Sequence, residues 1–212
     1  MRVVLTIPFF LLPSTALVFH FAARWLDREA GYLLGFAFYW VFWCLIVPLL
    51  VLRWEGFRTL LTDRAPLTSR ANWLAVALLV VITLVTLVMY GRDFLRAPFV
   101  LILVALPLAI VNGICEELLW RGLYVRTFPG NFWLAILFPA AAFALWHLVS
   151  QSIFLAENRL GFVLSTFLLG LAYGWIAYRT GSARWPAISH SLNGVLALSG
   201  MLAPSILKLF GR

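Results

Sequence analysis

Two adjacent glutamates and an arginine lie in the segment VNGICEELLWRGLY, inside a chain that is otherwise strongly apolar. On an α-helix Glu117 and Arg121 are one turn apart, so they can form an ion pair on one face. Glu116 points about 140° away from Arg121 on such a helix, and the pair leaves its carboxylate without a partner. A buried carboxylate without a cationic partner is a candidate general base. A purely structural ion pair is the alternative, and it explains Glu117 and Arg121 but not Glu116.

Two histidines follow, each with a second notable side chain about one helical turn away. The segment FALWH contains Phe143 and His147, and the segment SHSLNG contains His190 and Asn193. Residues three or four apart share a helix face, so each pair can point into one site. Taken singly, each is equally explained as a packed histidine or as an amide that bonds neighbouring helices. Together with the glutamates they predict one buried polar site.

The elements that would position these residues are membrane-spanning helices. The chain is 64% hydrophobic and 11% charged, whereas soluble domains carry roughly 25% charged residues. A helix needs about 20 apolar residues to cross a bilayer. About seven such segments are present: 3–22, 31–52, 71–90, 99–121, 131–153, 159–178 and 185–207. We therefore predict an all-α, polytopic transmembrane bundle, since long apolar runs exclude the alternating strands of a barrel.

The helix rise allows a test of whether the polar residues lie at one depth. Measured back from the expected helix end, Glu116 lies about 16 Å into the membrane. A helix that starts or is kinked at Pro139 places His147 about 12 Å beyond that residue, and His190 lies about 6 Å into the last helix. All three then occupy the same half of the bilayer. A helix that begins at Asn131 and has no kink places His147 about 24 Å deep, and the three side chains then differ more in depth.

The charge distribution bears on partners and on orientation. The net charge is +8, but the basic residues lie at span ends and form no stripe, so no nucleic acid is expected as a partner. The polar loop 53–70 contains four arginines and is the best candidate for a cytoplasmic loop, which makes the N-terminus cytoplasmic. Fifteen arginines against one lysine suggest a GC-rich prokaryotic genome, hence a prokaryotic cell membrane. Cys44 and Cys115 lie in apolar segments and predict neither a disulfide nor a metal motif.

The three motifs resemble those of the CPBP family, which includes CAAX-type prenyl-protein endopeptidases and bacteriocin-processing or immunity proteins of the Abi type. That family carries EExxxR, FxxxH and HxxxN on successive helices, and this chain has EELLWR, FALWH and HSLNG. The resemblance covers roughly residues 100–200 and suggests a division into N-terminal helices (1–98) and a catalytic core (99–212). One position departs from the family: Gly194 stands four residues after His190, and Asn193 comes one residue early.

The resemblance implies an intramembrane endopeptidase that uses a glutamate. Glu116, assisted by His147, would activate a water that attacks a peptide carbonyl. His190, together with Asn193, would stabilise the oxyanion, a contribution often worth several kcal/mol. Three further residues of the motifs would shape the site or bind the substrate: Glu117, Arg121 and Phe143.

Metal dependence is a separate question. One glutamate and two histidines could bind zinc and leave one position open. The chain has no HExxH motif, and the resemblance implies chemistry without a metal. We therefore expect no cofactor, with zinc as the alternative.

The expected partners are the lipid bilayer and a membrane-anchored protein or peptide substrate. Whether that substrate is prenylated stays open. A catalytically inactive CPBP-like scaffold or bacteriocin-immunity protein is the main alternative function. A small proton-coupled transporter is a third, although the chain shows no inverted repeat of the kind found in many transporters.

Overall fold

The described residues of the chain, 2–154 and 158–201, are helical wherever they are regular, and they contain no strand. The predicted all-α bundle is therefore confirmed. The elements are α1 (Arg2–Trp25), α2 (Arg28–Phe38), η1 (Tyr39–Ile46), α3 (Val47–Phe57), η2 (Arg70–Asn72), α4 (Trp73–Arg96), α5 (Phe99–Glu117), η3 (Leu118–Leu123), α6 (Tyr124–Thr127), η4 (Trp133–Leu137), α7 (Phe138–Ser150), α8 (Arg159–Thr180) and α9 (Arg184–Met201). The coordinates are a computed structural model, in which η1, η3 and η4 are π-helical turns and η2 is a 3₁₀ turn.

Six helical runs in the described part of the chain are long and apolar enough to cross a membrane. They are Arg2–Trp25, Arg28–Phe57, Arg70–Arg96, Phe99–Thr127, Trp133–Ser150 and Arg159–Thr180. The seventh predicted span corresponds to α9, which carries polar side chains and is not among the six; residues 202–207 of that prediction lie outside the described residues. The protein is thus an integral, multi-pass membrane protein.

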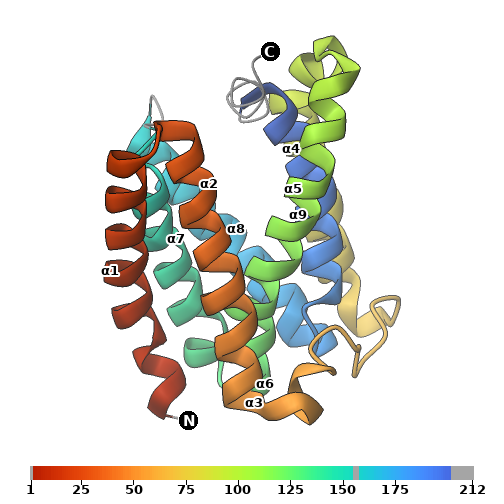
Figure 1. Cartoon of the computed structure of the whole chain (residues 1–212). Coiled ribbons are helices and arrows are strands. Elements are labelled where there is room, and N and C mark those ends of the chain that lie inside the picture. Colours follow the sequence, from red (N-terminus) through yellow and green to blue (C-terminus); the bar gives the residue numbers. More distant parts are fainter. Residues whose placement is uncertain (1, 155–157, 202–212) are drawn as a thin grey trace.

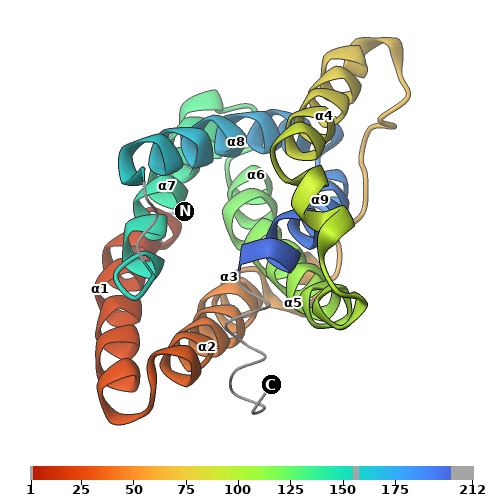
Figure 2. The ribbon, with the colours of Figure 1, turned by 90° about the horizontal axis from the view of Figure 1, so that it is seen from above.

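Successive spans run in opposite directions, so the end of one span and the start of the next lie at the same end of the bundle (Figure 1). Seen from above, the helices form an open ring, with α1 and α2 on one side and α4, α5 and α9 on the other (Figure 2). The helix pairs in closest contact are α5 with α9, α1 with α2, and α7 with α8. Within α4 only Ala75 is buried, and many of its apolar side chains are exposed, as expected for a helix with one face toward lipid.

Small residues allow α5 and α9 to approach closely. Ala105, Ala109 and Gly113 recur every fourth residue on α5 and are buried. A Cβ atom added to Gly113 would lie 2.7 Å from the backbone nitrogen of Ser191, and one added to Gly194 would lie 3.1 Å from the Cβ of Ala109. Such contacts are typical of helix packing in membranes. In this chain, the position where the family has an asparagine is therefore a packing position.

Aromatic side chains join the N-terminal helices to the later ones. The rings of Tyr39 (η1) and Trp146 (α7) stack with centroids 4.0 Å apart. The indole N–H of Trp120 (η3) donates a hydrogen bond of 2.7 Å to the Tyr39 hydroxyl. All three side chains are buried in one core cluster. The surroundings of the polar site therefore include residues of the N-terminal helices as well as of the later helices.

Two helices differ from their predicted form. The helix that carries His147 begins at Trp133, close to the Asn131 start, and Pro139 lies in the first turn of α7 after a π-helical turn. The prediction that the helix starts at Pro139 is therefore wrong, whereas the π-helical turn just before Pro139 interrupts the regular α-helix there. Residues Leu118–Leu123 form a π-helix rather than a continuation of the α-helix. Such π-turns are rare and occur frequently at functional sites.

Candidate active site

The predicted ion pair between Glu117 and Arg121 is present and fully buried. Arg121 Nη1 lies 2.9 Å from Glu117 Oε1, and the side chains are 2% and 0% exposed. The same Oε1 also accepts a hydrogen bond of 2.9 Å from His190 Nδ1. Among the described residues, Glu117 Oε2 and Arg121 Nη2 have no hydrogen-bond partner. Glu117 thus joins the arginine one turn later to a histidine from α9.

Phe143 connects this pair to α7. The guanidinium carbon of Arg121 lies 4.3 Å from the centroid of the Phe143 ring and 5.6 Å from that of Tyr173. A cation over an aromatic face is attracted by the ring quadrupole, most strongly where water is excluded. The first motif therefore packs directly on the second.

Glu116 has surroundings of a different kind. Its Oε1 accepts a hydrogen bond of 3.3 Å from the indole N–H of Trp146, and its Oε2 accepts one of 3.2 Å from the Asn112 amide. His190 Nε2 lies 3.7 Å from Oε2. The side chain is 2% exposed, and no arginine or lysine among the described residues pairs with it. The prediction that the ion pair leaves Glu116 out is confirmed.

His190 lies between the two glutamates. Because an ionised carboxylate only accepts hydrogen bonds, the contact with Glu117 places a proton on Nδ1 and turns Nε2 toward Glu116. Hydrogen bonds to oxygen are about 2.8 Å long, so one oxygen atom can contact both Nε2 and Glu116 Oε2 across their 3.7 Å separation. The ring of Tyr173 stacks on the imidazole at 5.7 Å. This geometry allows one water molecule to bind both groups at once.

His147 occupies a separate position on α7. Its Nδ1 lies 2.8 Å from the backbone carbonyl of Phe143, and since a carbonyl only accepts, the neutral ring carries its proton on Nδ1. Its Nε2 then has a free lone pair. Within the described part of the chain, His147 forms no hydrogen bond to Glu116 or His190. The direct link from α7 to Glu116 comes from the preceding residue, Trp146.

Asn193 is buried and bonded within its own helix. Its Nδ2 donates a hydrogen bond of 3.1 Å to Ser189 Oγ, which also accepts one of 3.1 Å from the Tyr173 hydroxyl. Its Oδ1 has no partner among the described residues. The structure therefore places Asn193 one turn from His190 without a hydrogen bond between them.

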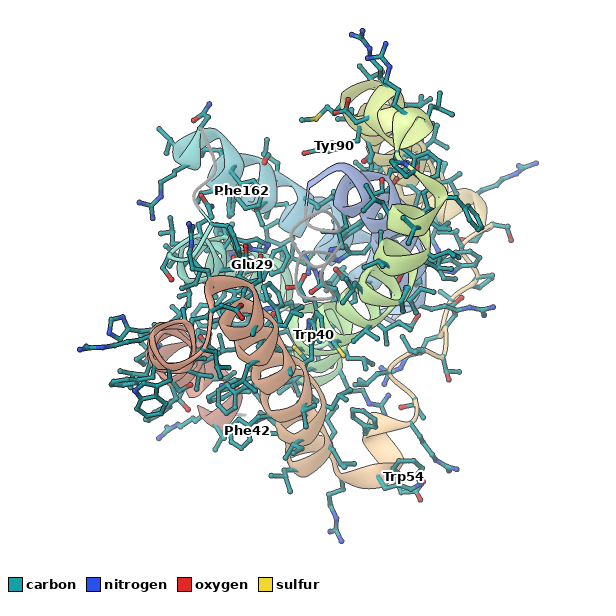
Figure 3. The ribbon with its side chains drawn as sticks, turned by 45° about the horizontal axis from the view of Figure 1, so that its top comes forward. Glu29, Trp40, Phe42, Trp54, Tyr90 and Phe162 are labelled. Carbon is teal, nitrogen blue, oxygen red and sulfur yellow. The ribbon has the colours of Figure 1, made fainter. Side chains whose placement is uncertain are left out.

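The sequence analysis missed the residues that hold the Glu116 carboxylate. Asn112 lies one turn before Glu116, and a lone amide in an apolar helix is a signal that could have identified it. Its Oδ1 accepts a hydrogen bond of 2.9 Å from the indole of Trp40. Figure 3 shows Trp40 on the side of η1 that faces α5, with Phe42 on the other side. Nothing local marks Trp40, because it is 72 residues away from Asn112 in the chain.

A small cavity adjoins the hydrogen bonds that link Trp40, Asn112 and Glu116. It has a volume of about 70 Å³, lies between α2, η1, α5 and α9, and reaches Asn112. Its walls are largely apolar and aromatic: Tyr32, Leu33, Phe36, Trp40, Leu108 and Leu198. An apolar group can therefore approach the Glu116 side of the site from between α2 and α5.

The residues proposed as zinc ligands do not form a ligand cluster. In the part of the chain that the structure describes, no three His, Cys, Asp or Glu side chains are arranged to hold a metal ion. His190 directs one ring nitrogen to each glutamate, and His147 stands apart. Cofactor independence remains a prediction. Both cysteines are buried free thiols, which agrees with the absence of a disulfide.

The fold and the site together define a multi-pass helical membrane protein with a buried glutamate–histidine cluster. Residues 97–196 match the family model described as Rce1-like, type II CAAX prenyl endopeptidase Rce1-like, so this segment of the chain is similar to that family. All three motifs lie inside the matched segment, so the resemblance stated from them is confirmed. No curated protein and no solved structure matches the chain.

Proposed function

We propose that this protein is an intramembrane endopeptidase that hydrolyses a peptide bond of a membrane-anchored protein or peptide through a water activated by Glu116. One observation carries the proposal: the buried Glu116 carboxylate is held by two neutral N–H donors, with Nε2 of His190 3.7 Å away. A base oriented in this way, without an arginine or lysine paired with it among the described residues, suits proton abstraction. The described surroundings of Glu117 suit an ion pair instead.

Each of these residues has a separate role in the proposed reaction. Glu116 takes a proton from the attacking water, and His147 Nε2 assists in moving it. The hydroxide adds to the peptide carbonyl, whose oxygen becomes negative. His190 in its imidazolium form donates its Nε2 proton in a hydrogen bond to that oxygen while Nδ1 stays bonded to Glu117, with Asn193 as a second donor. Glu116 then returns the proton to the leaving amine.

Arg121 and Phe143 act through Glu117 rather than on the substrate. Arg121 fixes the Glu117 carboxylate, which in turn fixes the imidazole of His190. Phe143 covers the guanidinium and, through its backbone carbonyl, sets the tautomer of His147. These groups would orient the reacting ones before the substrate arrives.

The substrate class follows from the location of the site. A buried site in a bundle with little mass outside the membrane suits a substrate held in the bilayer, cut near its C-terminus. The family's description names prenyl endopeptidases, so a prenylated C-terminus is one form of this substrate. We assign the arginine-rich end of the bundle, which includes the N-terminus, to the cytoplasmic side of a prokaryotic cell membrane.

A scaffold or immunity function without catalysis is the second candidate. The specific observation in its favour is Gly194, which packs against Ala109 where the family has an asparagine. Asn193 donates to Ser189 and not to His190.

The test compares strains that express wild type, Glu116→Gln, His147→Ala or Asn193→Ala. The membrane fraction is analysed for intact masses and C-terminal peptides. Uncut species should accumulate with Glu116→Gln and His147→Ala and thereby reveal the substrate. Glu55→Gln is the matched control, because the exposed Glu55 pairs only with Arg58 at the surface. Identical proteomes in all strains, together with a phenotype on deletion of the protein, would favour the scaffold.

A further inference from the structure

A second and larger cavity lies at the arginine-rich end of the bundle. Its volume is about 330 Å³, and its walls come from the loop after α3, the end of α6 with the turn that follows it, and the end of α8. Its lining includes the polar residues Arg64, Tyr178 and Arg179 and the apolar residues Val125, Pro129 and Ala65. None of these residues belongs to the proposed catalytic reaction.

Hydrogen bonds fix the walls of this cavity. The backbone N–H groups of Arg64 and Ala65 both donate to the carbonyl oxygen of Thr180, at 2.8 and 3.1 Å. Arg179 donates from Nε to Asn72 Oδ1 at 3.0 Å and from Nη2 to the carbonyl oxygen of Ala71 at 2.7 Å. The loop is therefore attached to the end of α8 at several points, and the cavity is preformed.

Gly181 sets the position of Arg64. Its φ of +73° is left-handed and ends α8, a conformation that glycine adopts without strain. A Cβ atom at this position would lie 2.9 Å from the Cβ of Arg64. The glycine thus lets the arginine lie directly against the end of the helix.

The charge of the cavity is positive and uncompensated. Its described lining includes two arginines and no acidic residue. Asp63 is the acidic residue nearest to Arg64 in the sequence. Its carboxylate accepts hydrogen bonds from Ser182 and from the Trp185 indole and lies 3.9 Å from Arg184. Arg64 forms no ion pair with any described residue.

The location of the cavity indicates where its ligand comes from. Its end of the bundle carries eight arginines against two acidic residues in the described chain, whereas the opposite end carries five against three. Arginines between the ends of transmembrane helices on such a side bind lipid phosphates. The apolar wall beside the arginines matches the boundary between headgroup and acyl chain.

We propose that the cavity between Arg64, Tyr178 and Arg179 binds a phosphate group, that of an anionic phospholipid at the membrane surface. Inorganic phosphate offers the same anionic oxygens, so the experiment separates the two sources. This site is independent of the proposed peptidase activity.

The test is native mass spectrometry of the purified full-length protein in detergent, titrated with phosphatidylglycerol or with phosphatidylcholine of the same acyl chains. Arg64→Gln should weaken phosphatidylglycerol binding about tenfold, as expected for the loss of a charge-assisted hydrogen bond. Arg64→Lys should retain much of it. Arg96→Gln is the matched control, since Arg96 is an exposed arginine at the opposite end and should leave binding unchanged. Thermal unfolding checks that each variant is folded.

The outcomes distinguish a bound phospholipid, bound inorganic phosphate and the absence of a phosphate site. Wild-type preference for phosphatidylglycerol that disappears in Arg64→Gln, and that millimolar inorganic phosphate does not compete away, supports a lipid site. Competition by inorganic phosphate with the same dependence on Arg64 supports the phosphate site and assigns it to the free ion. Equal binding of both lipids, or equal effects of Arg64→Gln and Arg96→Gln, overturns the proposal.

Discussion

Glu116 and Glu117 are neighbours in the chain and are equally buried, but their surroundings differ. Glu117 contacts a guanidinium at 2.9 Å and an imidazole at 2.9 Å. Glu116 contacts a neutral amide at 3.2 Å and a neutral indole at 3.3 Å. The one group they share is His190. Successive residues on a helix diverge by about 100°, so each carboxylate faces a different set of helices.

In the mechanism that we propose, this difference separates a structural carboxylate from a reactive one. A buried carboxylate bonded to a guanidinium is stabilised as an anion, and removing its partner leaves an uncompensated charge. A carboxylate held by neutral donors is oriented without a guanidinium or ammonium group bonded to it. The two environments predict opposite consequences for the same substitution at adjacent positions.

The largest expected effect is on turnover at Glu116. Glu116→Gln retains the shape of the side chain and removes the base, so kcat should fall about 10²–10⁴-fold. Thermal unfolding in detergent should be nearly unchanged, because an amide oxygen still accepts from Trp146 or Asn112. The measurement is kcat on the substrate that the strain comparison reveals, beside the unfolding midpoint. Unchanged kcat would contradict the role of Glu116 as base.

Substitution of Glu117 should lower the stability of the protein. Glu117→Gln or Arg121→Met leaves one member of a buried ion pair alone, a loss of about 3–5 kcal/mol in the free energy of unfolding. Chemical denaturation in mixed micelles measures this loss. The double variant Glu117→Gln/Arg121→Met should recover part of it, since no lone charge remains. A single variant as stable as wild type would erase the distinction between the two carboxylates.

The donors to Glu116 should have smaller, kinetic effects. Trp146→Phe keeps the ring that stacks on Tyr39 and loses the indole N–H, and Asn112→Leu loses the amide. Each lost hydrogen bond is worth about 0.5–1.5 kcal/mol, so kcat should fall roughly two- to tenfold with KM little changed. A change confined to KM would mean that these residues bind substrate rather than orient the base.

Trp40 should show the smallest effect. Trp40→Phe leaves Asn112 in place but removes the donor that fixes its amide. Since Trp40 acts only through Asn112, we expect a change of about twofold in kcat, and none when Asn112→Leu is already present, because sites in one network are not additive. Additive losses in the double variant would exclude the relay.

Much of the fold could be read from the residues themselves. A chain that is 64% hydrophobic forms membrane helices whatever its tertiary contacts. The positions of the spans 3–22 and 159–178 were close to α1 and α8. The π-helical turns were not predictable, because η1 and η4 consist of apolar residues only and show no periodicity that would distinguish an α from a π turn. The seventh span was the least apolar, since it contains His190, which bonds to Glu117, and Ser189 and Asn193, which bond to each other.

Local spacing also decided which groups could pair. The separation of one turn between Glu117 and Arg121 fixes their ion pair on any helix, and it leaves Glu116 outside that pair. The order of the three motifs in the sequence was sufficient to identify the family. These features need no knowledge of how helices pack.

Tertiary packing alone decided what each carboxylate contacts. Trp146 reaches Glu116 across 30 residues of sequence, and His190 reaches Glu117 across 73. Those distances depend on Gly113 and Gly194, which bring α5 against α9, and on the aromatic stack that sets α7 against η1. Packing also left His147 without a hydrogen bond to Glu116, although its motif suggested one. The sequence by itself determined the types of the reactive groups and their local pairing. The close approach of helices distant in sequence, set by small residues and stacked rings, determined which of those groups meet.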